Sequence, residues 1–249
     1  MLSIEMLIAA LACGLGAGTQ SPKPAPKPTV DVGHVVQAVE NHYRDANTLQ
    51  ADFLERYSEG GKQSRVESGR VFFARAGRMR WEYQSPETKL FVSDGKTLWF
   101  YVPQDHTATR QLVKQSDDWR TPLALLTRDV RLSRLCGRIE LGSAAPLSDG
   151  QVVLRCWPRG EAPLGAAASQ ENSATPLDSS AGFTEVFLEA NPASGELSDV
   201  RVEQPGGVEL EFRFGAWRIN PPLSHSLFEF EPPIGVAIIP ADTEPDFGP

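Results

Sequence analysis

From Leu49 onward the apolar residues recur at every second position, in short segments separated by turn residues. This period of two is that of a β-strand with one buried face, and it constrains the fold more than any other feature. The predicted strands are residues 51–57, 65–75, 79–84, 89–93, 97–102, 134–141, 151–157, 183–190, 197–203, 208–214 and 227–230. About eleven strands joined by short turns indicate an antiparallel sheet that curls on itself.

Composition agrees with a mainly β protein. The chain has 21 Gly and 20 Pro among 249 residues, too many for a helical bundle. Its 41% hydrophobic content suffices for a core, and its length fits one domain. Because the formal net charge is -8, the chain lacks the cationic field that binding to a phosphate backbone requires. We expect no nucleic-acid partner.

Two helices are predicted. Apolar residues in 32–46 recur at intervals of three and four, which is typical of an amphipathic helix. Thr121-Pro122 can provide the N-cap and first residue of a short second helix over LALLTR. Between LFVS and KTLWFY, Asp94-Gly95 predicts a two-residue type I′ hairpin turn, which needs positive φ at both positions.

The N-terminus is typical of an export signal. The apolar run 6–15 is too short to span a bilayer, which needs about 20 residues, and small residues follow it. The segment before the run carries Glu5 and no Lys or Arg, which departs from the usual signal. We expect residues 1–18 to be a signal peptide. Cys13 follows Ala-Leu-Ala, out of register with a lipobox, and is interpreted as a small apolar residue of the signal rather than a lipid attachment site.

Three segments are predicted to lie outside the folded core. Residues 19–30 contain SPKPAPKP and form a proline-rich tether. Residues 159–181 are poor in large apolar side chains and are interpreted as a flexible insertion between two strands. Residues 240–249 are an acidic, proline-rich tail. A single domain over residues 31–239 remains.

Cys136 and Cys156 lie on either side of a turn rich in Gly, Pro, Ser and Asp. In a hairpin centred on Pro146 the two would face each other, and in an oxidising compartment they could form a disulfide. The alternative is a pair of buried free thiols. Two cysteines and four scattered histidines do not suggest a metal site, so we expect no metal.

Aromatic residues are concentrated on consecutive predicted strands. Eight of them lie between Phe72 and Tyr101. Such density would give the sheet a wide apolar face. Either the rings fill the protein's own core, or they line a cavity for an apolar ligand. Composition does not choose between the two.

Four segments resemble the periplasmic outer-membrane lipoprotein carrier protein LolA family. They are RMRWEYQSP (78–86), VSDGKTLWFYVP (92–103), TPLALLTR (121–128) and FEFEPPIGV (228–236), in the family's order. The resemblance covers roughly residues 35–236. It implies a mainly β (α+β) fold, namely an unclosed, strongly curved antiparallel β half-barrel with a long N-terminal helix and a short helical lid.

The resemblance also implies a function and partners. A protein of this family is a soluble periplasmic chaperone, here expected to be a monomer, that holds the acyl chains of lipoproteins in an apolar cavity. It accepts these acylated lipoproteins from an inner-membrane ABC complex and passes them to an outer-membrane lipoprotein receptor.

Site residues follow from the same resemblance. Arg75 is similar to a family arginine that holds the lid closed, although Ala76 stands where the family often has proline. The alternative for Arg75 is a strand-end arginine facing solvent. A one-residue error in strand register exchanges the two faces, so the face of each aromatic stays open. The cavity candidates are Phe53, Phe72, Trp81, Phe91, Trp99 and Tyr101.

An enzyme is disfavoured. The histidines show no HExxH spacing, and no G-x-S-x-G, P-loop or Rossmann glycine pattern occurs. We therefore expect no catalytic residues and no cofactor. The competing hypothesis is a membrane-anchored lipid- or lipoprotein-binding receptor, or an envelope-stress sensor, of similar curved-sheet fold. Membrane anchoring would require a working lipobox at Cys13.

Overall fold

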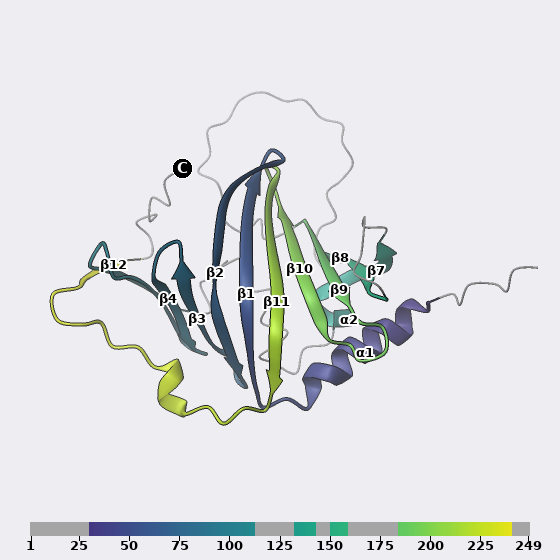
Figure 1. The fold of residues 1–249 in the computed structure, drawn as a ribbon, viewed down its shortest axis with the longest axis horizontal. Coiled ribbons are helices and arrows are strands. Elements are labelled where there is room, and N and C mark those ends of the chain that lie inside the picture. The colour runs from purple at the N-terminus through teal and green to yellow at the C-terminus, as the bar shows by residue number, and fades with distance from the viewer. Residues whose placement is uncertain (1–29, 113–131, 143–149, 159–183, 241–249) are drawn as a thin grey trace, which may run out of the picture.

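The computed structural model describes residues 30–112, 132–142, 150–158 and 184–240. Within these ranges one 12-stranded sheet dominates, in the order β12-β6-β5-β4-β3-β2-β1-β11-β10-β9-β8-β7 (Figure 1). The helices are α1 Val32–Arg44, α2 Leu132–Leu135 and the 3-10 helix η3 His225–Phe228. The strands are β1 Thr48–Glu59, β2 Lys62–Ala74, β3 Arg78–Ser85, β4 Lys89–Asp94, β5 Thr97–Val102, β6 Thr107–Leu112, β7 Cys136–Gly142, β8 Val152–Pro158, β9 Glu185–Ala190, β10 Leu197–Gln204, β11 Val208–Ile219 and β12 Ala237–Pro240.

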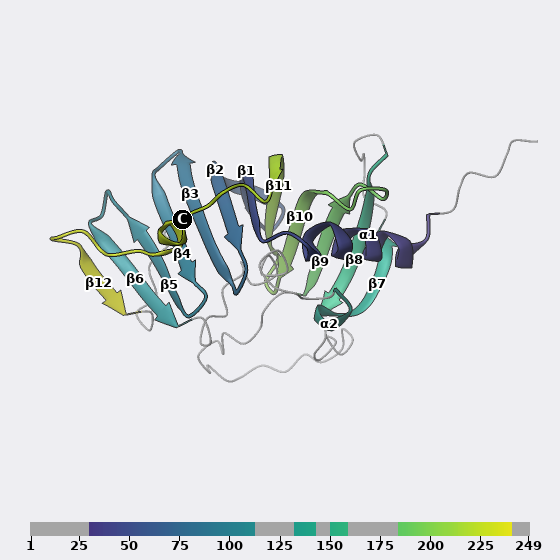
Figure 2. The same cartoon turned by 90° about the horizontal axis from the view of Figure 1, so that it is seen from below.

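The sheet is strongly curled and open. Trp81 on β3 and Phe212 on β11 are three strand spacings apart, which is about 14 Å in a flat sheet. Their ring centroids are nevertheless only 5.4 Å apart, so the sheet bends around the face that carries them. Viewed from below, the strands form an arc from β12 to β7 (Figure 2). The mainly β, curled half-barrel expected from the sequence is confirmed.

Gly69 on β2 accommodates part of this bend. It pairs with Phe53 on β1 and Tyr83 on β3, next to a register shift between Ser68 and Gly69. A Cβ at Gly69 would lie 1.9 Å from the carbonyl oxygen of Glu82, so only glycine lets β3 approach this closely.

The strand predictions are confirmed except at residues 134–135, which lie in α2, and at residues 227–230. There Leu223, Leu227 and Phe228 pack against Phe72 and Ala74 on the face of β2 opposite α1. The segment therefore crosses the sheet instead of joining its edge, and it contains η3 rather than a strand. Two strands were not predicted, β6 and the short β12, which pairs with β6 in parallel. Neither has the alternating apolar pattern of the other strands.

The hairpin of β4 and β5 is confirmed, but its predicted type I′ turn is wrong. Ser93 pairs with Leu98, which leaves a four-residue connection. Of Asp94 and Gly95, only Gly95 has positive φ. The Asp94 carboxylate instead accepts hydrogen bonds from the backbone N–H groups of Lys96 and Thr97, each at 2.7 Å. This side-chain turn replaces the backbone geometry that the Asp-Gly pair suggested.

Helix α1 is confirmed and crosses the sheet over β7 and β8 (Figures 1 and 2). The carboxylate of Asp31 accepts from the N–H of His34 at 2.8 Å and caps its first turn. Its buried residues Val35, Val39 and Tyr43 join the main core cluster. The predicted second helix, signal peptide and insertion, nearly all of the tether and most of the tail lie outside the described residues.

The turn between β9 and β10 fixes where α1 lies. Leu197 donates from its backbone N–H to the Tyr43 hydroxyl at 2.9 Å. Two residues earlier, Gly195 has φ 77°, and a Cβ there would lie 2.1 Å from the carbonyl oxygen of Ala38 in α1. Helix and turn are thus in backbone contact.

Gly195→Ala should lower the free energy of unfolding by about 2–4 kcal/mol, because strain at positive φ adds to the overlap with α1. The measurement is chemical denaturation. Gly206→Ala is the matched control, since Gly206 has φ 84° with no atom within 4 Å of the added carbon. It should lose only about 1–2 kcal/mol. Equal losses would contradict the close contact between α1 and this turn.

Candidate functional site

The concave face of the sheet is apolar and continuous. On β1, β2 and β3 the inward side chains follow the period of two, and the same face continues over β8 to β11 and under α1. Members of this cluster from the central strands are Leu49, Ala51, Phe53, Val71, Phe73, Met79, Trp81, Phe91, Leu98, Leu210, Phe212 and Phe214. This face carries the larger of the two hydrophobic clusters given by the described residues, and the candidate site lies on it.

Trp81 lies at the centre of the concave face. Its ring centroid is 4.8 Å from that of Phe53, 5.8 Å from Phe73, 5.4 Å from Phe212 and 6.3 Å from Phe214. Most of these pairs meet edge to face, the arrangement that aromatic quadrupoles favour. The rings come from four strands, and the curl brings those of β1 and β11 to Trp81 on β3.

A polar cluster interrupts the apolar face at the end away from α1. The Tyr83 hydroxyl donates to Glu55 Oε2 at 2.7 Å, and Lys89 Nζ donates to Glu67 Oε1 at 2.6 Å. Glu55 and Glu67 face each other across β1 and β2 and are 1% and 4% exposed. The guanidinium of Arg65 lies 3.3 Å from Glu67 and 3.9 Å from Glu55. Two buried carboxylates are therefore balanced by two cations, of which Arg65 is partly exposed.

The sequence analysis missed this cluster as a unit. The available signal was Glu55, which occupies the inward phase of an otherwise apolar alternation on β1. Its cross-strand partners could not be identified, because pairing it with Glu67 requires the register of the hairpin.

The six predicted cavity aromatics divide between the two faces. Phe53, Trp81 and Phe91 lie on the concave face and are buried. The other three face outward: Phe72 packs with Phe228, and the rings of Trp99 and Tyr101 lie 5.6 and 5.3 Å from Phe230. On β5 the inward residues are instead Leu98 and Phe100, which the sequence analysis did not single out as cavity residues.

Arg75 lies at the turn between β2 and β3, beside the connection from α1 to β1. Its backbone N–H donates to the carbonyl of Asn47 at 3.2 Å, and its own carbonyl accepts from Arg78 Nε at 3.0 Å. Among the described residues its half-buried guanidinium has no hydrogen bond or ion pair, and the predicted lid helix lies outside them. Ala76 has φ 66°, which proline cannot adopt, so this turn differs from one carrying the family's proline.

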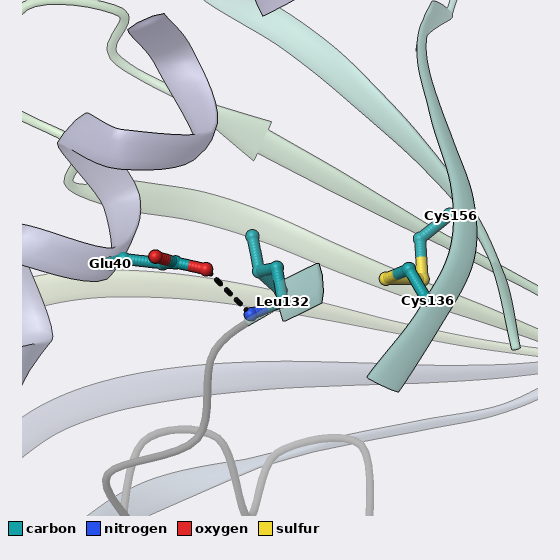
Figure 3. The surroundings of a disulfide bond; sticks show 4 residues. All are labelled: Glu40, Leu132, Cys136 and Cys156. Atoms are coloured by element: carbon teal, nitrogen blue, oxygen red, sulfur yellow. Dashed lines mark hydrogen bonds between the residues drawn. A yellow bond between two sulfur atoms is a disulfide. The ribbon is translucent and has the colours of Figure 1, made fainter. Parts of the chain in front are cut away.

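Cys136 and Cys156 join β7 to β8 by a disulfide, with Cα atoms 5.5 Å apart (Figure 3). The hairpin register is shifted from one centred on Pro146, since Cys136 pairs with Pro158 and Cys156 with Ile139. Nearby, the backbone N–H of Leu132 in α2 donates to Glu40 Oε1 of α1 at 2.8 Å (Figure 3). The disulfide and this bond hold the β7 edge near α1.

The outward face of β10 and β11 is charged. Burial and the neighbouring charge of Glu211 raise the pKa of Asp199 to about 7, although Arg213 lies 3.5 Å from its carboxylate. The pKa of Glu211 is lowered despite its burial, because its carboxylate accepts hydrogen bonds from Arg56 and Arg213. Paired charges cover this outer surface, in contrast to the apolar concave face.

The described ranges contain neither a candidate metal site nor a candidate membrane-spanning helix. No group of three or more His, Cys, Asp or Glu side chains there could hold a metal ion. In the same part of the chain, no helix has the length and apolarity needed to cross a membrane.

Fold and site together define an open, curled β half-barrel with an apolar concave face covered at one end by a helix. Residues 44–138 match the family Outer membrane lipoprotein carrier protein LolA. An outer-membrane lipoprotein carrier protein of Chromobacterium violaceum is 27% identical over 234 residues, covering 94% of this chain and 95% of the relative. One of Coxiella burnetii is 28% identical over 195 residues, covering 77% and 80%. The LolA-family resemblance is thereby confirmed.

Among solved structures, a LolA superfamily protein of Nitrosomonas europaea is 10% identical with a TM-score of 0.41, covering 81% of this chain and 99% of that one. This likeness is too low to bear on function.

Asp199→Asn should raise the free energy of unfolding at pH 8 by about 1–2 kcal/mol, because an amide avoids the repulsion from Glu211. The folded state binds the Asp199 proton more tightly than the unfolded state, where the pKa is about 3.9. The wild type should therefore lose stability as pH rises from about 4 to about 7, and the variant less so.

Denaturation at several pH values measures this effect. Asp52→Asn, at an exposed position on the same outer face, is the control and should change stability by less than about 0.5 kcal/mol. Identical pH profiles for wild type and Asp199→Asn would show that the proton is not bound there.

Proposed function

We propose that this chain is a soluble periplasmic chaperone that binds the acyl chains of lipoproteins on its concave face. It carries them from an inner-membrane ABC complex to an outer-membrane receptor. The observation that carries the proposal is the continuous apolar concave face of a curled sheet, in a chain similar to outer-membrane lipoprotein carrier proteins over 94% of its length.

The physical need for such a carrier is large. Exposing one acyl chain of about 16 carbons to water costs on the order of 12 kcal/mol, at about 0.8 kcal/mol per methylene. A lipoprotein therefore crosses an aqueous space only if its chains are covered. The apolar cluster on β1, β2, β3 and β11 offers that cover.

The same face is suited to releasing its cargo. In the free protein Trp81 and Phe91 are buried by contacts with the protein itself. Acyl chains must displace some of these contacts, so the gain from burying the chains is offset by the lost ring contacts. A receptor can then take the chains without nucleotide, because the carrier does not hold them at their full transfer free energy.

Adjacent residues on β5 offer a matched test. Phe100 and Tyr101 are both half-buried aromatics, but Phe100 packs with the concave cluster and Tyr101 faces outward. Inner-membrane vesicles carrying the ABC complex and a labelled lipoprotein are incubated with ATP and the purified protein. We expect wild type to recover the lipoprotein in the soluble fraction.

Phe100→Gln should reduce recovery about tenfold, because the amide would be buried against hydrocarbon, whereas Tyr101→Gln should stay within about twofold of wild type. Circular dichroism and melting temperature check that both variants are folded. No recovery by wild type would refute the carrier function. Equal losses in both variants would refute the assignment of cargo to the concave face.

The proposed lid-gating role of Arg75 has a separate test. Arg75→Leu should weaken lid closure and impair transfer of lipoprotein to outer-membrane vesicles that contain the receptor, while the melting temperature stays close to wild type. Arg70→Leu is the control, because Arg70 is an exposed arginine on β2, the strand that ends just before Arg75. Wild-type transfer by Arg75→Leu, or its rescue of growth in a carrier-depleted strain, would count against gating.

A further inference from the structure

The indole N–H of Trp81 is a buried donor without an acceptor among the described residues. Trp81 is 0% exposed, and its Nε1 forms no hydrogen bond there. Its ring neighbours Phe53, Phe73, Phe212 and Phe214 offer only aromatic faces and edges. A buried donor left unpaired destabilises the folded state, because it loses its hydrogen bond to water without gaining another. The free protein therefore carries a local cost at the centre of its concave face.

Hydrocarbon does not remove this cost. A face that bound only methylene groups would be as well served by phenylalanine, which has no polar atom to satisfy. The cost is recovered only when an acceptor oxygen reaches Nε1. The ligand that completes this site therefore carries an oxygen next to its apolar part.

The position of Trp81 along the face indicates which oxygen. Toward α1 the inward neighbours are apolar, Met79 on β3 and Phe73 on β2. In the opposite direction the next inward residue of β3 is Tyr83, whose hydroxyl donates to Glu55. Trp81 thus lies at the boundary between the apolar part of the face and the polar cluster of Glu55, Arg65, Glu67, Tyr83 and Lys89.

An ester-linked acyl chain has the same succession of groups, from apolar through a hydrogen-bond acceptor to polar. Hydrocarbon ends at a carbonyl, and a polar glyceryl group follows. A carbonyl oxygen is an acceptor without a proton of its own and matches a lone N–H donor.

We propose that Trp81 Nε1 donates a hydrogen bond to an acyl ester carbonyl of the bound cargo. The hydrocarbon then extends toward Phe73, Met79 and α1, and the glyceryl and peptide part lies toward the polar cluster. This inference rests on the proposed function. It adds the orientation of the cargo and identifies Trp81 Nε1 as the group that recognises the ester linkage.

The test compares two lipopeptides that differ only in linkage. One carries a dipalmitoyl glyceryl cysteine with ester bonds, and the other carries the dihexadecyl ether analogue without those carbonyls. Dissociation constants are measured by displacement of a fluorescent apolar dye below the critical micelle concentrations. Trp81→Phe should weaken ester binding about five- to tenfold more than ether binding, since the lost volume affects both probes and the hydrogen bond only one.

Phe212→Leu is the matched control. It removes aromatic volume beside Trp81 without removing a donor, so it should weaken both probes equally. If Trp81→Phe does not fold, the wild type still provides a test. The Trp81 indole N–H resonance should move downfield when the ester probe binds and should not do so with the ether probe.

The outcomes separate the inference from the proposed function. Tight binding of both probes, with the same loss for each in Trp81→Phe and no ester-specific shift, would overturn the inference alone. No binding of either probe to wild type would overturn both. Dipalmitoyl phosphatidylglycerol is the third probe. Binding of this phospholipid that depends on Trp81 assigns the site to membrane lipids as well, and binding of the lipopeptide alone assigns it to lipoproteins.

Discussion

The convergence of aromatic rings around Trp81 is the contact on which the rest of this structure depends. Phe73 reaches Trp81 from the neighbouring strand β2, whereas Phe53, Phe212 and Phe214 reach it from β1 and β11, which a flat sheet would keep apart from β3. Their burial favours the curled sheet, and Gly69 lets β3 approach β2 closely enough for the curl to form. Once the sheet is bent, one face becomes concave and apolar. The outer face is left to paired charges and to the C-terminal segment.

Stability and the proposed function would compete for the concave face. The side chains that form the core of the free protein are also those that would contact an acyl chain, so binding exchanges one set of apolar contacts for another. In the proposed function, such an exchange would keep the net affinity well below the full transfer free energy of the chains. The polar cluster at the far end and α1 at the near end give the face a direction, which a uniform apolar groove would lack.

Local features were predictable from the sequence because they depend on neighbours in the chain. Helix α1, its start after Asp31 and the hairpin of β4 and β5 all follow from periodicity and turn residues. The strand prediction for residues 227–230 was wrong because it used only the local alternation of apolar residues. The segment instead lies across the sheet because Phe228 contacts Phe72, which is distant in the chain. The predicted type I′ turn at Asp94-Gly95 was wrong because the Asp94 carboxylate accepts hydrogen bonds from the backbone N–H groups that follow it.

The sequence by itself determined a mainly β chain, the order of most strands, the family resemblance and the aromatic-rich set from which the concave face is built. Only the tertiary structure decided that Phe53, Trp81 and Phe91 face inward while Phe72, Trp99 and Tyr101 face outward. Only the fold likewise assembles the cluster of Glu55 with Glu67 and leaves Trp81 Nε1 without a partner among the described residues. The reason is that a period of two defines two faces equally well. Strand register and sheet curvature, set by contacts distant in the chain, choose which face becomes the interior.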